Sequence, residues 1–179
     1  MNARDRAAEI AAQVRDPEMP MLTLADLGVL RGVDIEPPPG TGTGDGTDAG
    51  GTVVVSITPT YTGCPAMATM RDDIVHRLNR AGFPRVEVRV VLDPPWSSDL
   101  ITERGREALR AAGLSPPGPA PRRGAGPVPL TLGPARTAPP CPRCGSAATR
   151  LTSEFGATAC KALYTCTACL EPFEHVKEI

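Results

Sequence analysis

Two pairs of cysteines near the end of the chain constrain its fold more than any other feature of the sequence. Cys141 with Cys144 and Cys166 with Cys169 each have the spacing Cys-x-x-Cys, and twenty-one residues separate the pairs. Two such turns can present four thiolates to one metal ion in a tetrahedral arrangement. The residues around them include few apolar side chains, so they could hardly fold without the ion. The sequence therefore predicts a zinc ribbon over residues 141–179.

Iron and disulfides are the two alternatives to zinc at these cysteines. The proline that follows Cys141 is similar to the knuckle of rubredoxin, which holds a single iron. Disulfides suit secreted proteins, but residues 1–10 are charged and no apolar signal-peptide core follows them. No apolar run is long enough to span a bilayer. We therefore expect a cytoplasmic protein whose six cysteines are metal ligands or reactive thiols.

Composition argues against a nucleic-acid-binding protein. The formal net charge is −1, whereas affinity for nucleic acid depends largely on neutralising phosphates with lysine and arginine. Aromatic residues make up 3% of the chain, too few for a surface on which bases stack. The 21 prolines and 18 glycines exceed what one compact fold would use, so part of the chain should be linker.

The periodicity of apolar residues predicts a small two-layer α/β domain before the cysteines. Helices are expected over residues 4–14, 65–81 and 99–112, and strands over 29–36, 53–58 and 86–92. The first two strands should be antiparallel, and Val86, Val88, Val90 and Leu92 should form the buried face of the third. The resulting order is α–β–β–α–β–α, which ends near residue 114 and precedes the C-terminal zinc ribbon.

Two stretches rich in proline and glycine lie within and after the predicted α/β domain. Residues 37–51 contain nothing to bury and predict a flexible insertion within the domain 1–114. Residues 115–140 predict an extended linker with no core of its own, which leads to the ribbon at 141–179.

The turn before the last predicted helix has an aromatic residue and two candidate caps. Asp93-Pro94-Pro95-Trp96 predicts a rigid turn, and Trp96 is expected to pack against the helices and not to bind a ligand. Either Ser97 or Ser98 can accept the first backbone N–H groups of the helix that follows.

Cys64 is the candidate for chemistry outside the ribbon. Pro59 and Gly63 end the second strand, and Pro65 suits the first position of a helix, where its missing N–H is not needed. The cysteine should therefore lie at the helix cap, where the positive end of the dipole lowers a thiol pKa. Such a thiolate is a candidate nucleophile or soft-metal ligand. The alternative is a buried cysteine that only packs the turn.

Three residues are candidate supports for the Cys64 site. Glu18 and Asp26 are the acids of the irregular segment 18–28, and either they cap turns or one of them holds or tunes the cysteine. Thr58, at the end of the second strand, is grouped with them as a supporting residue.

Cys160 is the cysteine that neither site uses. It is either a buried filler or a second reactive thiol, activated by Lys161 and able to act with Cys64. A hydrolytic cysteine–histidine pair is improbable, because His76 lies twelve residues along the helix that starts after Cys64. That separation is roughly 18 Å in a helix, beyond the reach of a general base.

Several motifs resemble known families. Asp16-Pro17-Glu18-Met19-Pro20, Asp26-Leu27-Gly28-Val29 and the segment from Thr58 to Pro65 resemble the small iron–sulfur assembly domain of SufT-like proteins. Asp93-Pro94-Pro95-Trp96-Ser97-Ser98-Asp99, Gly113-Leu114-Ser115-Pro116-Pro117 and the cysteine-rich tail narrow this resemblance to PaaD-like accessory subunits of the bacterial phenylacetyl-CoA epoxidase system.

The resemblance implies an accessory subunit that is not itself the oxygenase. Its domain around Cys64 would help mature or deliver an iron–sulfur or other metal centre, by transient binding of iron or a cluster. The oxygenase and reductase components would be partner chains, and a homodimer is left open. The alternative is a non-catalytic interaction subunit that bridges oxygenase components through the zinc ribbon. No Glu-x-x-His pair of the di-iron type is present, which agrees with an accessory role.

Overall fold

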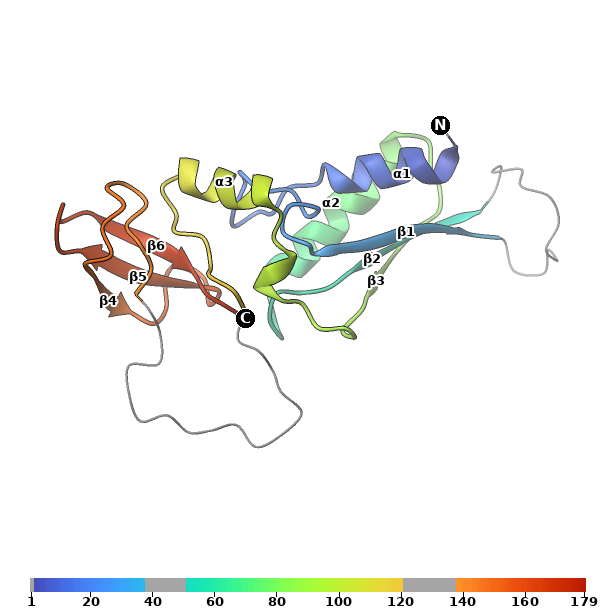
Figure 1. The fold of residues 1–179 in the computed structure, drawn as a ribbon. Helices are drawn as coiled ribbons and strands as arrows, with labels where there is room; N and C mark the ends of the chain where they lie inside the picture. The colour runs from blue at the N-terminus through green and yellow to red at the C-terminus, as the bar shows by residue number, and fades with distance from the viewer. Residues whose placement is uncertain (1, 38–50, 121–137) are drawn as a thin grey trace. The chain divides into compact units, whose positions relative to one another are not determined.

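The fold is that of a computed structural model, which describes residues 2–37, 51–120 and 138–179 (Figure 1). The chain separates into two compact units, Met1–Trp96 and Ser97–Ile179. The boundary between the units falls after Trp96, whereas the periodicity of apolar residues predicts that the first domain ends near residue 114. Most of the predicted insertion and of the predicted linker lies outside the described residues. Within the described part of the chain, no helix is long and apolar enough to cross a membrane.

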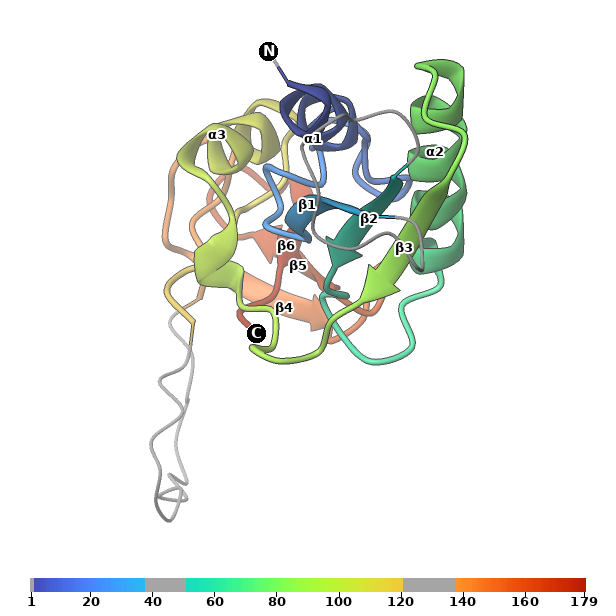
Figure 2. The same ribbon diagram turned by 90° about the vertical axis from the view of Figure 1, so that its right-hand side faces the viewer.

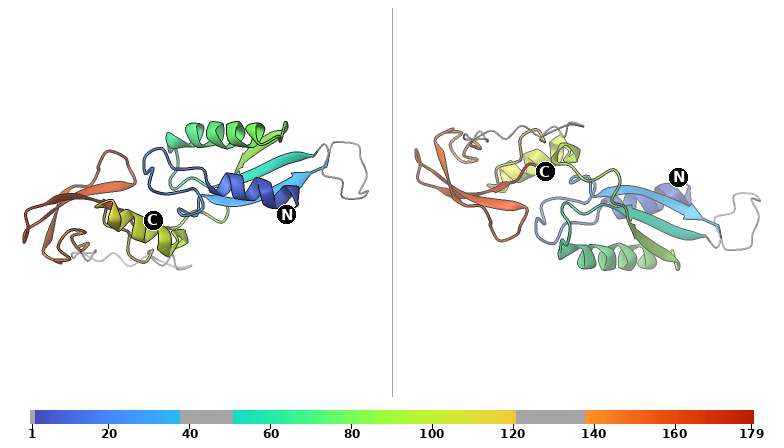
Figure 3. Two further views of the ribbon diagram at one scale, coloured as in Figure 1. Left: turned by 90° about the horizontal axis from the view of Figure 1, so that it is seen from above. Right: turned by 90° about the horizontal axis from the view of Figure 1, so that it is seen from below.

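The first unit is a three-stranded sheet covered by two helices, as the two-layer prediction requires. Its strands are β1 (Leu30–Glu36), β2 (Thr52–Ile57) and β3 (Val86–Val90), in the order β1-β2-β3. The β1–β2 pair is antiparallel, as predicted, and β3 runs parallel to β2. Helices α1 (Ala3–Ala12) and α2 (Ala66–Arg80) cover one face of the sheet (Figures 2 and 3).

Alternating apolar residues of β2 and one stripe of α2 form the core of this unit. Val53, Val55 and Ile57 point to one side of the central strand and are almost fully buried. Met70, Ile74 and Leu78 recur at helical spacing on α2 and are buried too.

The prediction of a buried face on the third strand is wrong at the C-terminal end of that strand. Val90 is 45% exposed and Leu92 is 67% exposed. The strand ends at Val90, and β3 is the last strand of the sheet, so no neighbouring strand among the described residues covers its outer side. Alternation indicates which residues share a face, but it does not indicate that a strand lies at an edge.

The second unit contains the ribbon together with the last helix of the predicted first domain. Strands β4 (Thr149–Ser153), β5 (Lys161–Cys166) and β6 (Pro172–Val176) form an antiparallel sheet in the order β4-β5-β6. The helix predicted over 99–112 is instead a short 3₁₀ turn, η1 (Ser98–Leu100), followed by α3 (Glu103–Ala111). Ser97 caps η1, as predicted for one of the two serines, but Thr102 caps α3 because Ile101 is extended.

The start of the predicted linker belongs to this unit and is bonded to the last strand. The Ser115 N–H donates to the Glu174 carbonyl at 2.9 Å, and the Val176 N–H donates to the Ser115 carbonyl at 3.0 Å. The Glu178 carboxylate accepts hydrogen bonds from the Gly118 N–H at 3.0 Å and from His175 at 3.2 Å. The described start of the predicted linker, residues 115–120, is therefore held against the ribbon by hydrogen bonds.

We expect the Glu178 contacts to make the second unit sensitive to acid. The hydrogen bond from His175, opposed by burial and aided by the Gly118 N–H, lowers the pKa of Glu178 to about 2. Because this pKa is below that of an unfolded glutamate, about 4.3, the stabilisation is complete above that value and is lost as pH falls toward 2. Urea unfolding of wild type and Glu178→Gln should differ by roughly 1–2 kcal/mol at neutral pH, and by less at pH about 4. A difference that does not change with pH would contradict this role.

Candidate functional site

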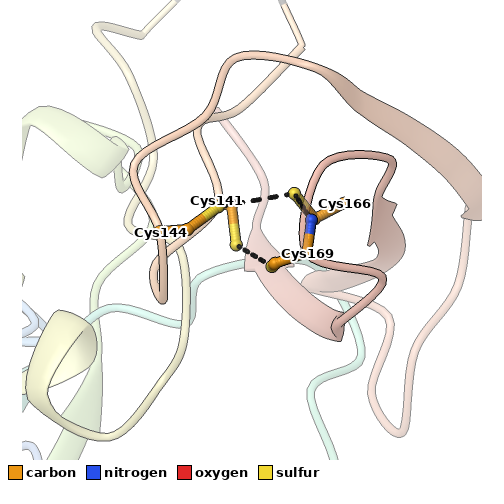
Figure 4. A group of neighbouring side chains, drawn as sticks. All are labelled: Cys141, Cys144, Cys166 and Cys169. Atoms are coloured by element: carbon orange, nitrogen blue, oxygen red, sulfur yellow. Dashed lines mark hydrogen bonds between the residues drawn. The ribbon is translucent and has the colours of Figure 1, made fainter.

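Two turns place four cysteines of the second unit around one point (Figure 4). Cys141 and Cys144 precede β4, in a turn where the Gly145 N–H donates to the Cys141 carbonyl at 2.9 Å. Gly145 has φ of 73°, a conformation that other residues rarely adopt. Cys166 ends β5 and Cys169 lies in the turn to β6. Both predicted knuckles therefore form, and they face each other.

The sulfur positions fit a tetrahedral metal ion. All four lie within 4.8 Å of one another, with Cys141 and Cys169 3.8 Å apart and Cys144 and Cys166 3.6 Å apart. A regular tetrahedron with zinc–sulfur distances of about 2.3 Å has edges of about 3.8 Å. None of the six cysteines, all within the described residues, forms a disulfide, so that alternative is not supported. The four thiols are suited to a structural zinc.

Backbone groups of the second knuckle prepare one thiol for metal binding. The N–H of Cys169 and then that of Ala168 hydrogen-bond the Cys166 sulfur and lower its pKa to about 7, against burial. The pKa of Cys169 is raised to about 12: the Glu171 N–H lowers it, but the neighbouring Cys144 thiol and burial outweigh that bond. Thiols that are hydrogen-bonded to one another lose their protons and become thiolate ligands when a metal cation binds.

The metal site and the ribbon core share residues. Two ligands, Cys141 and Cys166, are buried in one cluster with Ala162, Tyr164 and Phe173. The rings of Tyr164 and Phe173 stack with centroids 5.8 Å apart. An ion at the site would therefore fix the cluster, and losing the ion would expose it.

Cys160 is outside the four-cysteine group. It is buried, and its sulfur lies 3.1 Å from the Thr158 hydroxyl oxygen. The Lys161 ammonium, predicted to activate it, instead pairs with the Glu174 carboxylate at 2.8 Å. Cys160 belongs to the second unit and Cys64 to the first, so a joint site of these two thiols stays a prediction.

Cys64 lies in the loop between β2 and α2 and is half-buried. Its N–H donates to the Tyr61 carbonyl at 3.4 Å, and its carbonyl accepts from the Met67 N–H at 3.3 Å. Pro65 is the N-cap of α2 and makes no side-chain cap, so Cys64 comes one residue before the cap. The position is close to the predicted one, whereas the lowered pKa and the chemical role of the thiol remain predictions.

Among the proposed supporting residues, Asp26 closes a local turn, and a contact of any of the three with the Cys64 site stays a prediction. The Asp26 carboxylate accepts from the Thr23 hydroxyl at 2.7 Å and from the Thr23 N–H at 3.1 Å, which closes the turn 23–26. Glu18 is half-buried, and its N–H donates to the Asp16 carboxylate at 2.8 Å. The hydroxyl of Thr58 is buried and has no hydrogen-bond partner among the described residues.

Asp16 and Trp96 organise the first unit more than sequence reasoning indicated. Asp16 is buried and also accepts from the Met19 N–H at 2.7 Å, so it shapes the loop that Glu18 was predicted to serve. An aspartate two and three residues before those N–H groups is a usual turn signal. Trp96 is buried and donates from its ring nitrogen to the Leu27 carbonyl at 2.8 Å, whereas its packing against the helices stays a prediction.

Two family models match separate parts of the chain. Residues 9–90 match the family described as iron–sulfur cluster assembly protein, which covers Cys64 and most of the first unit. Residues 125–177 match the PaaD zinc beta ribbon domain, which contains all four clustered cysteines. The class is therefore an iron–sulfur-assembly domain joined to a zinc ribbon.

One curated relative covers almost the whole chain. It is a protein of Escherichia coli (strain K12) named as a subunit of the "Putative 1,2-phenylacetyl-CoA epoxidase". The two are 40% identical over 168 residues, which are 94% of this chain and 88% of that protein. The chain belongs to the family of this epoxidase subunit.

Two solved structures are also similar to this chain. A domain of unknown function, DUF59, from Bacillus anthracis is 24% identical over 59% of this chain and 90% of its own, with a TM-score of 0.46. A Mycobacterium tuberculosis protein associated with Fe-S complex assembly and repair is 32% identical over 60% of this chain and 84% of its own, with a TM-score of 0.34.

Proposed function

We propose that the chain is an accessory subunit of a phenylacetyl-CoA epoxidase system that helps to mature or deliver an iron–sulfur or other metal centre through Cys64. The observation that carries this proposal is the place of Cys64, the single cysteine of a unit that matches the iron–sulfur assembly family, just before a helix N-terminus. The similarity to the Escherichia coli epoxidase protein supports the assignment of this chain to a phenylacetyl-CoA epoxidase system.

A site with a single thiol is better suited to transferring a metal centre than to retaining it. The Cys64 sulfur binds iron, or an iron of a cluster, after its proton passes to solvent, and the N–H groups at the start of α2 favour the resulting anion. Iron held by one protein thiolate keeps other coordination positions for a receiving site, so it can leave. The four cysteines of the ribbon form a closed site, which retains its ion.

The oxygenase and reductase components of the epoxidase system are the proposed partners. In this proposal the zinc ribbon is a docking module that brings Cys64 to the receiving component. The second candidate function is an interaction subunit that bridges these components without carrying metal. This function is favoured by the ribbon, which belongs to a separate unit and has its own four-cysteine site. Deletion of residues 141–179 should abolish association under either function, so a Cys64 variant is needed to distinguish the two functions.

We expect Cys64→Ser to fold and to associate normally while the partner component lacks its metal centre. The substitution replaces a soft ligand by a hydroxyl that binds iron poorly at neutral pH. Co-expression with the partner components, followed by iron and sulfide analysis of the purified complex, measures the loss. Loss of about tenfold or more in metal occupancy is the expected result, since replacing even an outer-shell partner of a metal ligand typically lowers metal affinity about 10–100-fold.

Cys160→Ser is the matched control for this experiment. It also removes one thiol outside the four-cysteine group, but that thiol is buried in the second unit. We expect metal occupancy of the partner to stay near that of wild type. Full occupancy with Cys64→Ser would contradict delivery and favour the bridging function.

A further inference from the structure

Strand β3 presents an edge to which another strand can be added. It is the last strand in the order β1-β2-β3, as far as the described residues extend. At its two ends the Arg85 carbonyl accepts from Val53 and the Val91 N–H donates to Ile57, so odd-numbered residues direct their backbone groups to β2. In a parallel pair the residues between them direct their groups the other way. Val86, Val88 and Val90 therefore present N–H and C=O groups at the outer edge.

This edge is also apolar, which is unusual for an edge that stays solvent-exposed. Val90 is 45% exposed, and Leu92, just beyond the strand, is 67% exposed. Proteins normally protect such edges with short strands, charges or covering segments, because an open apolar edge pairs with other chains. Val86 and Val88 are half-buried on the same side of the strand.

We propose that β3 pairs with β3 of a second copy of this chain, antiparallel, about a two-fold axis at Val88. In this register Val88 faces Val88 of the second copy, and Val86 faces Val90 of the second copy. All of these residues direct their backbone groups outward, so each facing pair exchanges two hydrogen bonds. Leu92 then faces Pro84 of the second copy, whose missing N–H leaves no donor unpaired there.

Charge complementarity within β3 favours a second copy over an unrelated strand. The register that joins the valines also places Glu87 opposite Arg89 of the second copy, and Arg89 opposite Glu87. Opposite charges at facing positions stabilise a strand pair, whereas a parallel pairing in register would align like charges. The strand Val-Glu-Val-Arg-Val is thus complementary to itself when reversed, as a two-fold interface requires.

The charges that this pairing uses already form ion pairs within one chain. Arg89 donates to Glu87 at 2.7 Å and to Glu36 at 2.8 Å. Their side chains remain 42–50% exposed, so a second Glu87 can approach the guanidinium. Five residues from each copy would bury less surface than a standard interface, which buries about 1,600 Å². We therefore expect a weak dimer with a dissociation constant in the micromolar range.

Sedimentation equilibrium of the full, metal-loaded chain tests this pairing. Wild type should reach a monomer–dimer equilibrium at concentrations of tens to hundreds of micromolar. A pair of Glu87→Arg chains would have four positive charges at the facing positions, and a pair of Arg89→Glu chains would have four negative charges there. Each variant alone should therefore be monomeric. An equimolar mixture of the two variants restores opposite charges at every facing position, and it should dimerise again. Expected changes in Kd are about tenfold or more for each variant alone.

Val88→Pro tests the backbone of the same edge without changing charge. It removes an outward N–H at the centre of the proposed pair and leaves the bonds to β2 in place, as proline does on edge strands. It should be monomeric with unchanged far-ultraviolet circular dichroism. A wild type that stays monomeric throughout, a dimer that all three variants retain, or a mixture that fails to dimerise would each overturn the proposal.

Discussion

Removing the metal from the full chain is expected to unfold the ribbon of the second unit and to leave the first unit folded. The reason is that Cys141 and Cys166 belong both to the four-thiol group and to the buried cluster with Ala162, Tyr164 and Phe173. Structural zinc in small domains contributes about 10–16 kcal/mol of apparent binding free energy, which the few apolar contacts of the ribbon could not replace. The first unit has a core of its own in β2 and α2.

Hydrogen exchange of the full chain, with and without a chelator, measures this effect by segment. Amides of β5 and β6 should lose protection by several orders of magnitude, and those of β2 should keep theirs. Cys166→Ser should give the same result without chelator, while Cys160→Ser should retain both metal and protection because it lies outside the group. Protected β5 amides in the metal-free chain would show that the ribbon folds alone. Elemental analysis of the native protein distinguishes zinc from iron.

Local signals made the metal site and the β2–α2 turn predictable from sequence. Each knuckle is a turn of four residues, so its spacing alone fixes where the two sulfurs point. Gly63, with φ of 85°, and Pro65 fix the turn that carries Cys64 in the same way. The chemical role of Cys64 does not follow from this turn, because it depends on what the thiol meets in a partner.

Features that depend on distant parts of the chain could not be predicted from sequence. The exposure of Val90 depends on β3 lying at the edge of its sheet, which its own alternation does not encode. Ser115 and Gly118 resemble linker because of the prolines around them, yet they bond to β6 and to Glu178, about sixty residues away. The boundary between the units falls after Trp96 for the same reason: residues 97–120 group with the ribbon, because Ser98 bonds to Ile179 and Ser115 bonds to β6.

Replacing Trp96 should destabilise the first unit more than any other change to the chain after β3. The indole is 5% exposed, and its N–H donates to the Leu27 carbonyl at 2.8 Å. Trp96→Ala removes the buried ring and leaves a cavity, at a cost of about 3–5 kcal/mol. Trp96→Phe keeps most of the packing but leaves the Leu27 carbonyl without this donor, at a cost of about 1–3 kcal/mol.

Leu92→Ala is the matched control, because Leu92 is apolar, belongs to the same connection after β3 and is 67% exposed. Its cost should stay within about 0.5 kcal/mol, as for other surface substitutions. Urea unfolding followed by hydrogen exchange of β2 amides compares the three variants, since the single tryptophan cannot serve as a probe once it is replaced. Equal costs for Trp96→Phe and Leu92→Ala would show that the bond to Leu27 does not stabilise the turn 23–26. The turn 23–26 would then depend on the Thr23 side-chain contacts and on backbone hydrogen bonds within this segment, and Thr23→Ala would become the larger perturbation of that turn.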